Sequence, residues 1–520
     1  MSRVLLINTN VMQPLVAPIG LDYVGSALQA AGIAVSLLDL AFVVGAQSAT
    51  PLRLDIEEEL TRAVERTMPE VIGVTVRNTD DCCMATHDFL LPRIADWIGV
   101  LRRRCPAPIV VGGIGFSVLP REAFAFLGAD YGIAGDGEET FPRLVKALKS
   151  DRLPTYPTSR IDDIPGLLWR KSDGELAFNP PVPTDTTQWP LPTRRLADNA
   201  RYTREGGMVG IETKRGCPAD CIYCADPVAK GRRSRLRPPR IIVEEIRDLI
   251  AQGADVYHTC DSEFNLPGEH GRAVCEAIVE AGLGERIRWF AYCSPVPFDG
   301  ETARLYRRAG CRGINFGTDS GSDAVLARLG RAHRRADILT AVAATKSAGM
   351  SCMLDLLLGG PGESRESLRE TIELARSCGA DRVGLSIGIR VYPGTPFADK
   401  ILSAQNLVTS GLWSVAGNQQ PATGNQRPGL SSQHSALRTQ DFLWPCFWIE
   451  PTLGDSIHDI VRELVGDDPR FFFMDPARTD ANYNYNDNSA LVQAIRRGYR
   501  GAFWDILRRV AENLPAEQKE

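Results

Sequence analysis

The stretch Val209-Gly-Ile-Glu-Thr-Lys-Arg-Gly-Cys217-Pro-Ala-Asp-Cys221-Ile-Tyr-Cys224 joins an apolar run to three closely spaced cysteines. Its first five residues have the composition of a short buried strand, so we expect the cysteines in the loop that follows. Thiolates are the ligands that iron–sulfur clusters require, and this spacing lets one loop wrap three of them around a face of a cubane. Three protein ligands leave one iron open to a ligand that is not protein.

Zinc is the alternative occupant of such a loop. A structural zinc site usually has four ligands, often as paired C-x-x-C units. The chain contains no second pair, and the nearest histidine is His258. The pattern therefore favours a [4Fe–4S] cluster held by Cys217, Cys221 and Cys224.

Strand and helix signals alternate on the carboxyl side of this loop. Between residues 205 and 400, apolar strand candidates are separated by helical stretches of more than ten residues. The candidates are 209–213, 256–260, 287–292, 313–317, 353–358 and 383–389. Six parallel strands with crossover helices predict a partial (β/α)6 barrel of the TIM type, with chemistry at the strand ends.

Residues 1–150 show the same alternation at shorter intervals. The strand candidates are 3–8, 34–40, 71–76, 109–111 and 131–134, and the helix candidates are 21–31, 57–67 and 89–104. Continuous apolar strands between amphipathic helices predict an α/β domain with a doubly wound, flavodoxin-like parallel sheet covered on both faces. Ligands of such sheets bind at the carboxyl ends of the strands, where the glycine-rich turns lie.

The remaining segments are less regular. Residues 151–204 are rich in proline and are predicted to be a linker, and 401–520 a mainly helical C-terminal lid or substrate region. Within that region, 403–436 is predicted to be flexible and 455–465 and 490–512 helical. The aromatic segments 444–448 and 483–486 are candidates for a lid, although such clusters more often belong to a core.

The composition limits the classes of function. The formal net charge is −5 and the one basic run is local, whereas nucleic-acid binding would need a larger basic surface. The chain shows no signal peptide and no apolar run of roughly 20 residues, so we expect no membrane span. Thirteen scattered cysteines favour reduced thiols plus a metal site in a cytoplasmic protein.

The C-x3-C-x2-C pattern, with Tyr223 just before the last cysteine, resembles the signature of the radical S-adenosylmethionine (SAM) superfamily. The resemblance implies that SAM chelates the open iron through its amino and carboxylate groups. It also implies that reduction of the cluster cleaves SAM to a 5′-deoxyadenosyl radical, and that a flavodoxin or ferredoxin supplies the electron.

Segments at further strand ends agree with this family. Cys260-Asp-Ser-Glu-Phe264, Phe316-Gly-Thr-Asp-Ser-Gly321 and the glycine-rich Leu358-Gly-Gly-Pro-Gly-Glu363 follow the second, fourth and fifth strands. Gly388-Ile-Arg-Val-Tyr-Pro-Gly-Thr-Pro396 follows the sixth strand and is typical of one branch of the family. Asp319 stands where the family usually has Glu, so the SAM atom that it reaches is open. Each segment alone is also typical of an ordinary barrel turn. The resemblance assigns the following residues to SAM: Tyr223, Asp261, Glu263, Asp319, Ser320, Gly359, Gly360 and Arg390.

A doubly wound domain ahead of such a barrel resembles the cobalamin-dependent branch of the family. The matching segments are 110–117 and 129–139, whose loops would enclose the nucleotide tail and the corrin edge. A sheet domain that binds nothing, or a docking module, is the alternative. The resemblance assigns the following residues to cobalamin: Arg77, Asn78, Gly112, Gly113, Gly115, Ser117, Gly135, Gly137 and Glu138.

The chain departs from some cobalamin proteins in one respect. It lacks the Asp-x-His-x-x-Gly motif, so cobalt would have no histidine as its lower ligand. Arg77 ends the third strand and would face the lower side of the corrin, where a cation disfavours donors on cobalt. A salt bridge with Asp80 or Asp81 is the equal alternative. His87 is predicted to be structural.

The resemblance implies a methyltransferase, in which SAM donates a methyl group to cobalamin and the methyl passes to a carbon of a small natural-product or amino-acid-like substrate. A second SAM would supply the radical that activates an unreactive carbon. The continuation Cys224-Ala-Asp-Pro-Val-Ala-Lys-Gly-Arg232 is similar to tryptophan methyltransferases of this branch. The alternatives are polar methylation of an sp2 carbon, ring contraction or oxidative cyclisation without methyl transfer, and a non-catalytic carrier or sensor.

Overall fold

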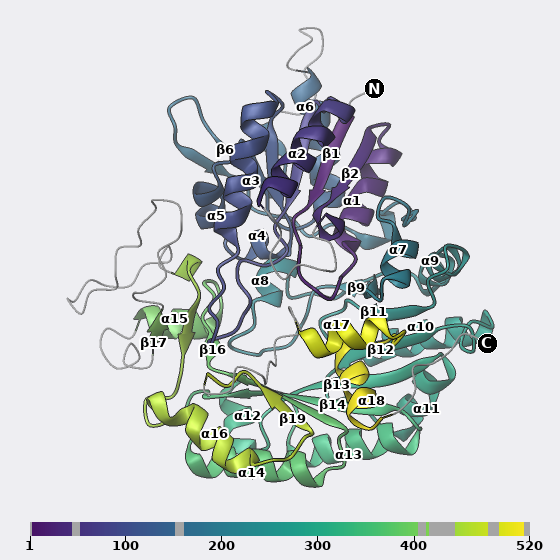
Figure 1. The fold of residues 1–520 in the computed structure, drawn as a ribbon, viewed down its shortest axis with the longest axis vertical. Coiled ribbons are helices and arrows are strands. Elements are labelled where there is room, and N and C mark those ends of the chain that lie inside the picture. The colour runs from purple at the N-terminus through teal and green to yellow at the C-terminus, as the bar shows by residue number, and fades with distance from the viewer. Residues whose placement is uncertain are drawn as a thin grey trace.

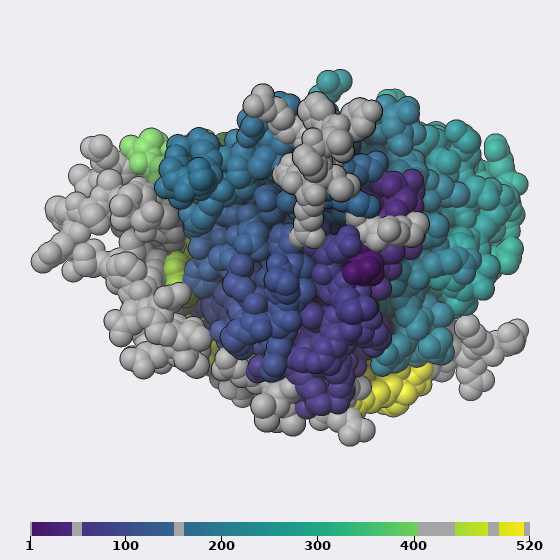
Figure 2. All heavy atoms as spheres, turned by 90° about the horizontal axis from the view of Figure 1, so that it is seen from above, coloured from purple at the N-terminus to yellow at the C-terminus, as the bar shows by residue number. Residues whose placement is uncertain are grey.

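The protein consists of two α/β units stacked on each other, with the C-terminal elements packed against the second unit (Figure 1). The structure is a computed structural model and describes residues 3–43, 53–150, 161–403, 412–414, 442–476 and 488–513. Seen from above, the purple and blue N-terminal unit covers the middle of the molecule, and the teal second unit emerges at one side (Figure 2). Helix α8 (Asp226–Lys230) and strand β9 (Lys214–Arg215) lie at the junction of the units.

The N-terminal unit is built on a sheet whose first five strands are parallel and run in the order β2-β1-β3-β4-β5. These strands are β1 (Arg3–Asn8), β2 (Ala34–Asp39), β3 (Val71–Thr75), β4 (Ile109–Gly112) and β5 (Tyr131–Ile133). One face packs on α1 (Ile19–Ala30) and α6 (Gly137–Ser150), and the other on α2 (Arg53–Thr67), α3 (Leu91–Arg104) and α5 (Pro120–Leu127). The predicted doubly wound sheet is confirmed, and its switch point lies between β1 and β3.

The segment predicted to be a linker contains two strands of this sheet. β6 (Leu167–Arg170) pairs antiparallel with β5, and β7 (Leu176–Phe178) pairs antiparallel with β6. Leu167 and Leu168 are fully buried. The linker prediction for 151–204 was therefore wrong over this hairpin, because strands of three or four residues gain their burial from the edge of β5. The Asp173-Gly174 turn between them is the signal that could have revealed it.

The second unit is an open barrel of parallel strands in chain order. Its six predicted strands are β8 (Val209–Ile211), β11 (Val256–Thr259), β12 (Arg288–Cys293), β13 (Cys311–Asp319), β14 (Ser351–Leu358) and β15 (Arg382–Ile387). The crossover helices are α9 (Pro239–Ala251), α10 (Gly268–Glu280), α11 (Gly300–Arg308), α13 (Arg335–Ser347) and α14 (Arg365–Ser377). The predicted partial TIM-type barrel is confirmed.

The barrel sheet also has a seventh strand that the sequence analysis did not predict. β19 (Phe471–Phe473) runs parallel to β15 and extends the sheet at that edge. Three residues are too few to show a periodic pattern, and the strand exists because β15 offers a free edge to an apolar segment. The C-terminal region therefore contributes to the barrel.

The rest of the described C-terminal region is mainly helical. α16 (Ile457–Val465) packs on α14, and the helix predicted at 490–512 is two helices, α17 (Ser489–Arg496) and α18 (Phe503–Ala511). Gly498 and Gly501, with φ of 96° and 137°, break it. No helix within the described ranges has the length and apolarity that crossing a membrane requires. Most of 403–436 and all of 483–486 lie outside the described residues.

The first of the two lid candidates belongs to a core. β18 (Cys446–Trp448) pairs with β16 (Ile389–Arg390) and β17 (Leu412–Ser414), and its three side chains are buried. Trp444 packs against Phe89 of the N-terminal unit, with a ring separation of 4.3 Å. These aromatics therefore hold the C-terminal region against both units.

Candidate active site

A cavity of about 590 Å³ lies between the two units and is lined from both sides. On the N-terminal side, its walls are formed by residues at the carboxyl ends of β1, β3, β4 and β5. On the barrel side, they are formed by α8 and by residues that follow β8 and β11. Both sets of strands thus direct their carboxyl ends at one space, which is where α/β sheets and barrels bind their ligands.

The cavity continues into the N-terminal unit along the sheet face that α1 and α6 cover. Leu6, Val110, Ile133 and Phe141 line this deep part, and all four side chains are apolar. At Gly73 an added Cβ would lie 2.7 Å from Leu6 Cδ2 and 2.8 Å from Phe141 Cε1, so the wall has no room for a larger residue. An apolar slot of this kind fits the flat aromatic base of the nucleotide tail of cobalamin.

The loops after β4 and β5 form the rim of this slot. The predicted cobalamin residues that line the cavity are Gly112, Gly113, Ser117, Gly135, Gly137 and Glu138. Gly113 has φ of 108°, a conformation that favours glycine. The Ser117 hydroxyl donates to the Gly113 carbonyl at 2.8 Å and accepts from the Gly135 N–H at 2.9 Å. Ser117 therefore joins the two loops, rather than keeping its hydroxyl proton free for the tail.

Two predicted cobalamin contacts do not line the cavity. Gly115 faces the backbone after β3, where an added Cβ would lie 2.9 Å from both Arg77 O and Asn78 Cα. Neither Gly115 nor Asn78 reaches the cavity wall. In the structure they pack the β3 and β4 loops closely together, and their contact with cobalamin stays a prediction.

Arg77 extends into the cavity. Its side chain lies between the units and is exposed to the cavity. Burial lowers the pKa of Arg77, and the nearest titratable side chains are Cys260, Tyr292 and Tyr202. The alternative salt bridge does not form, since Asp80 pairs with Arg390 at 3.0 Å. The arrangement leaves the guanidinium available to a ligand in the cavity.

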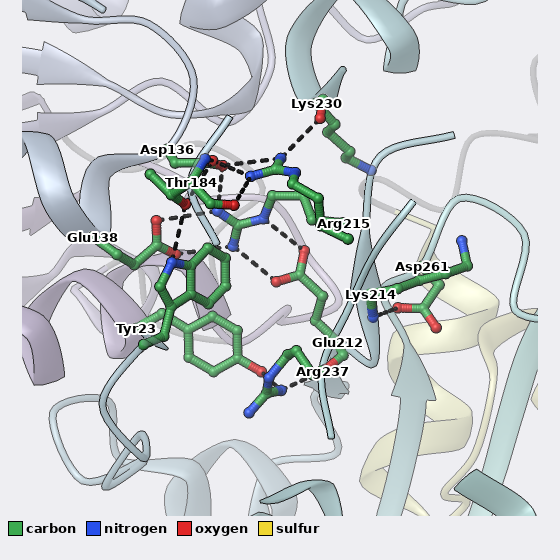
Figure 3. A network of polar contacts seen from close by, with 12 residues as sticks. Tyr23, Asp136, Glu138, Thr184, Glu212, Lys214, Arg215, Lys230, Arg237 and Asp261 are labelled. Carbon is green, nitrogen blue, oxygen red and sulfur yellow. Dashed lines mark hydrogen bonds and ion pairs between the residues drawn. The ribbon is translucent and has the colours of Figure 1, made fainter. Parts of the chain in front are cut away.

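A network of buried charges connects the rim of the cavity to the barrel (Figure 3). Arg215 of β9 contacts Asp136 at 2.8 Å, Glu138 at 2.9 Å and Glu212 at 2.8 Å. Its guanidinium lies over the ring of Trp189, 4.3 Å from the centroid. Both carboxylate oxygens of Glu138 accept hydrogen bonds from Arg215, at 3.1 and 2.9 Å. Glu138 thus takes part in an ion pair between the units, and its contact with cobalamin stays a prediction.

The three-cysteine loop lies directly between β9 and α8. Cys217 and Cys221 are buried, and Cys224 is half-buried. Backbone hydrogen bonds from Cys217 N to Gly231 O (3.1 Å) and from Ile222 N to Leu329 O (3.0 Å) fix the loop at both ends. Burial raises the pKa of the Cys224 thiol, and Asp226 and the other two thiols raise it further. One loop thus carries three thiols that influence one another, and three thiols are the donor set that an iron–sulfur cluster of this kind would use.

Arg331 joins this loop to two of the predicted SAM residues. Its Nη1 donates to Cys221 Sγ at 3.0 Å, and it forms ion pairs with Asp319 (3.3 Å) and Glu263 (3.6 Å). The Tyr223 hydroxyl donates to Asp319 at 2.5 Å. Sequence reasoning missed Arg331, because its position three residues after α12 (Asp323–Arg328) carries no motif.

Glu263, which pairs with Arg331 beside Cys221, has one carboxylate oxygen without a hydrogen-bond partner. Its Oε2 is buried and has no hydrogen-bond partner. Burial raises the pKa of Glu263 to about 7, although Arg331 lowers it. A buried acceptor without a donor fits a ligand that carries an ammonium group, such as the methionyl end of SAM.

Within the described residues, no three Cys, His, Asp or Glu side chains are placed to hold a single metal ion.

Other predicted SAM residues have structural partners instead. Ser320 is fully buried and bonds Thr371 Oγ1 at 3.0 Å. Arg390 is buried and donates to Asp80 and to backbone carbonyls, including Phe442 O at 3.1 Å. The polar atoms of Ser320 and Arg390 thus have partners within the fold, and their contact with SAM stays a prediction.

The last three predicted SAM residues support their own turns. Asp261 lines the cavity, but its carboxylate accepts from the Thr213 N–H and hydroxyl at 2.8 and 2.5 Å. The N–H groups of Gly359 and Gly360 both donate to Glu363 Oε2. These residues shape the strand ends, and whether they also contact SAM stays a prediction.

Comparisons with known proteins agree with this arrangement. The family model of the radical SAM superfamily matches residues 211–375, and that of the B12 binding domain matches residues 6–145. The tryptophan 2-C-methyltransferase of Streptomyces laurentii is 30% identical to the chain, over 96% of this chain and 95% of that protein. The chain belongs to the cobalamin-dependent radical SAM methyltransferases.

Solved structures of one methyltransferase of this family cover nearly the whole chain. The radical SAM methyltransferase TsrM of Kitasatospora setae, with tryptophan and a SAM analogue bound, has a TM-score of 0.86 at 28% identity, covering 99% of each chain. The same enzyme with cobalamin and a [4Fe–4S] cluster has a TM-score of 0.83 at 29% identity, covering 98% of each chain.

As a member of this family, the protein is a C-methyltransferase of a small molecule, and it uses a [4Fe–4S] cluster, SAM and cobalamin. The family relation favours methyl transfer over the alternatives of ring contraction, cyclisation and a non-catalytic carrier. The apolar slot, the unpaired Glu263 oxygen and the three thiols each fit one of the three groups.

Proposed function

We propose that the protein transfers a methyl group from SAM to a ring carbon of free tryptophan or a close indole relative. The likeness to TsrM with tryptophan bound, over 99% of both chains, is the observation that carries this proposal. The cavity supports it, since it extends from the deep apolar slot to α8, which begins two residues after Cys224. A substrate in that space would face both cofactors, as orientation requires.

The residues divide into three groups under this proposal. Cys217, Cys221 and Cys224 hold the cluster, and Glu263, together with the Tyr223–Asp319 pair, receives SAM beside it. The loops that end in Gly113 and Gly135 bound the cobalamin slot. Arg77 lines the cavity, and its positive charge would disfavour a further donor atom on the cobalt of bound cobalamin.

The chemistry of the substrate favours the polar route. When bound, SAM supplies the methyl group and cobalamin carries it to the substrate. A carbon of an indole ring is nucleophilic, and its C–H bond is strong, so removal of hydrogen by a radical gives little advantage. The protein therefore has to exclude water, orient the ring and accept a proton.

The cofactors of the reaction indicate an electron donor and a cellular compartment. We propose that a flavodoxin or ferredoxin reduces the bound cofactors, and that the enzyme works in the cytoplasm. None of the thirteen cysteines forms a disulfide in the structure, which fits a reducing compartment.

Product analysis tests the proposal. The anaerobically reconstituted enzyme is incubated with SAM and tryptophan, and the products are separated by mass spectrometry. We expect ring-methylated tryptophan and S-adenosylhomocysteine, without stoichiometric 5′-deoxyadenosine. Methylated product with equimolar 5′-deoxyadenosine would support the radical route instead, and no methylation of any indole amino acid would overturn the substrate assignment.

A further inference from the structure

The barrel wall of the cavity carries an ion pair within α8. Lys230 Nζ lies 3.0 Å from Asp226 Oδ2, and the hydroxyl of Ser262, which follows β11, hydrogen-bonds to both side chains. All three residues line the cavity. Neither side chain forms a hydrogen bond or ion pair with a cluster cysteine or with Arg215, although the Lys230 carbonyl accepts from Arg235.

The position of the pair is close to the place where the cofactors must meet. α8 begins two residues after Cys224 and packs against α4 (Ile114–Val118), which follows the glycine turn of β4. The side chains of Lys230 and Asp226 keep 20% and 32% of their accessible surface. They therefore lie inside the molecule and are still open to a ligand in the cavity.

The ion pair has a hydrogen-bond donor and a hydrogen-bond acceptor that are not used within the protein. An ammonium group has three N–H donors, and Lys230 uses two, on Asp226 and Ser262. Both bonds to the Asp226 carboxylate fall on Oδ2, which leaves Oδ1 as an acceptor. An inward ion pair contributes little to stability, because desolvation offsets its attraction. Binding of a ligand that carries a positive and a negative charge explains this ion pair in the cavity wall better than a role in stability does.

We propose that Asp226 and Lys230 bind the α-ammonium and the α-carboxylate of a free amino-acid substrate, with the ammonium at Asp226 and the carboxylate at Lys230. This inference rests on the proposed function and specifies how its substrate is recognised. The ion pair would hold the head group against α8 and leave the side chain to enter the space between the cofactors.

SAM also has an amino-acid head group, but the structure offers it a separate place. Glu263, Asp319 and Arg331 lie together beside Cys221 and do not line the cavity. The ion pair of α8 lines the cavity and contacts none of the three. The two head groups therefore have one charged site each.

Binding measurements on the cofactor-loaded enzyme test this inference. The dissociation constants of tryptophan, tryptamine and indole-3-propionate are measured by calorimetry for the wild type, Lys230→Met and Asp226→Asn. We expect Lys230→Met to weaken tryptophan by about 10- to 100-fold, the range for a lost hydrogen bond to a charged group, and to leave tryptamine unchanged. Asp226→Asn should weaken tryptophan and leave indole-3-propionate unchanged.

Arg232→Met provides the matched control. Arg232 forms an exposed ion pair with Asp220, two residues beyond Lys230 and outside the cavity wall. This variant should bind all three compounds as the wild type does. Iron, cobalamin and absorption spectra equal to those of the wild type verify that each variant is folded and loaded.

The outcomes separate the inference from the function on which it rests. If the wild type binds tryptophan and both variants bind it equally well, the inference is wrong and the function stands. If Lys230→Met weakens SAM instead of tryptophan, the pair holds the SAM head group and the inference is wrong. If the wild type does not bind tryptophan but binds another free amino acid, and Lys230→Met weakens that binding, the proposed substrate is wrong and the inference stands.

Discussion

Arg215 and Asp136 form an ion pair of 2.8 Å between a residue two positions before Cys217 and the loop that follows β5. Glu138, in the same loop, pairs with the same guanidinium, and Arg235 also contacts Asp136 (Figure 3). The start of the cysteine loop and the rim of the cobalamin slot are thus fixed to each other. Because methyl transfer needs both cofactors in register, this network would determine their relative position.

Replacing Arg215 should loosen both sites at once. Arg215→Met leaves the carboxylates of Glu138 and Glu212 inside the protein without this partner, whereas Asp136 keeps its ion pair with Arg235. Breaking a buried pair costs about 3–5 kcal/mol. We expect a lower melting temperature and loss of cobalamin on gel filtration, measured by the ratio of cobalt to protein. Arg215→Lys should retain part of the stability, since it keeps the charge but not the fork of donors. Unchanged cobalt retention in Arg215→Met would contradict this account.

Removing one cluster thiol should abolish the cluster. Cys221→Ala takes away a ligand that Arg331 orients, so the reconstituted variant should lose the charge-transfer absorption and most of its iron. Cys378→Ala is the matched control, because Cys378 is a half-buried free thiol at the end of α14, far along the chain from the loop. A full iron content in Cys221→Ala would show that the cluster is held elsewhere.

Arg77 should control the lower face of cobalt. Its guanidinium projects into the cavity, so Arg77→Gln would admit water as a cobalt ligand, whereas Arg77→Lys retains a cation there. We expect the electron paramagnetic resonance spectrum of bound cob(II)alamin to change in Arg77→Gln and to stay like that of the wild type in Arg77→Lys. Identical spectra for all three proteins would place Arg77 away from cobalt.

The carboxyl of Glu363 predicts a pH dependence of the apoprotein. Burial raises the pKa of Glu363 to about 7, from 4.5 in the unfolded chain. A raised carboxyl pKa stabilises the fold below the unfolded value, and this stability is lost as the pH rises from about 4.5 to 7. The loss should be about 3 kcal/mol at most. Denaturant unfolding across this range should show it in the wild type and not in Glu363→Gln; parallel curves would exclude Glu363 as the cause.

Much of the fold could be predicted from the sequence, because buried parallel strands are continuous apolar runs with turn residues at their ends. Each of the eleven predicted strands appears in the structure, with bounds that differ by a few residues. The short strands β6, β7 and β19 could not be predicted in this way. They obtain their burial from the edges of β5 and β15, which no local pattern records.

The site could be predicted where its chemistry depends on the spacing of residues in the sequence. It could not be predicted where the chemistry depends on the direction in which side chains point. Three thiols in one loop are informative by themselves. A motif after a strand, by contrast, says that a loop is present but not where its side chains point. Ser320 and Arg390 stand in family-like segments and turn towards Thr371 and Asp80. Arg331 lies beside Cys221, Glu263 and Asp319 because of how the barrel packs, and no sequence motif marks this position.

The transfer of a labelled methyl group tests the central claim most directly. The enzyme, loaded anaerobically with cluster and cobalamin, is given SAM with a deuterated methyl group, tryptophan and a reductant, and the products are examined by mass spectrometry and NMR. The account predicts tryptophan with the deuterated methyl on a ring carbon, and no product when cobalamin is left out. Equal methylation without cobalamin, or a label that never reaches a carbon of any indole amino acid, would contradict it.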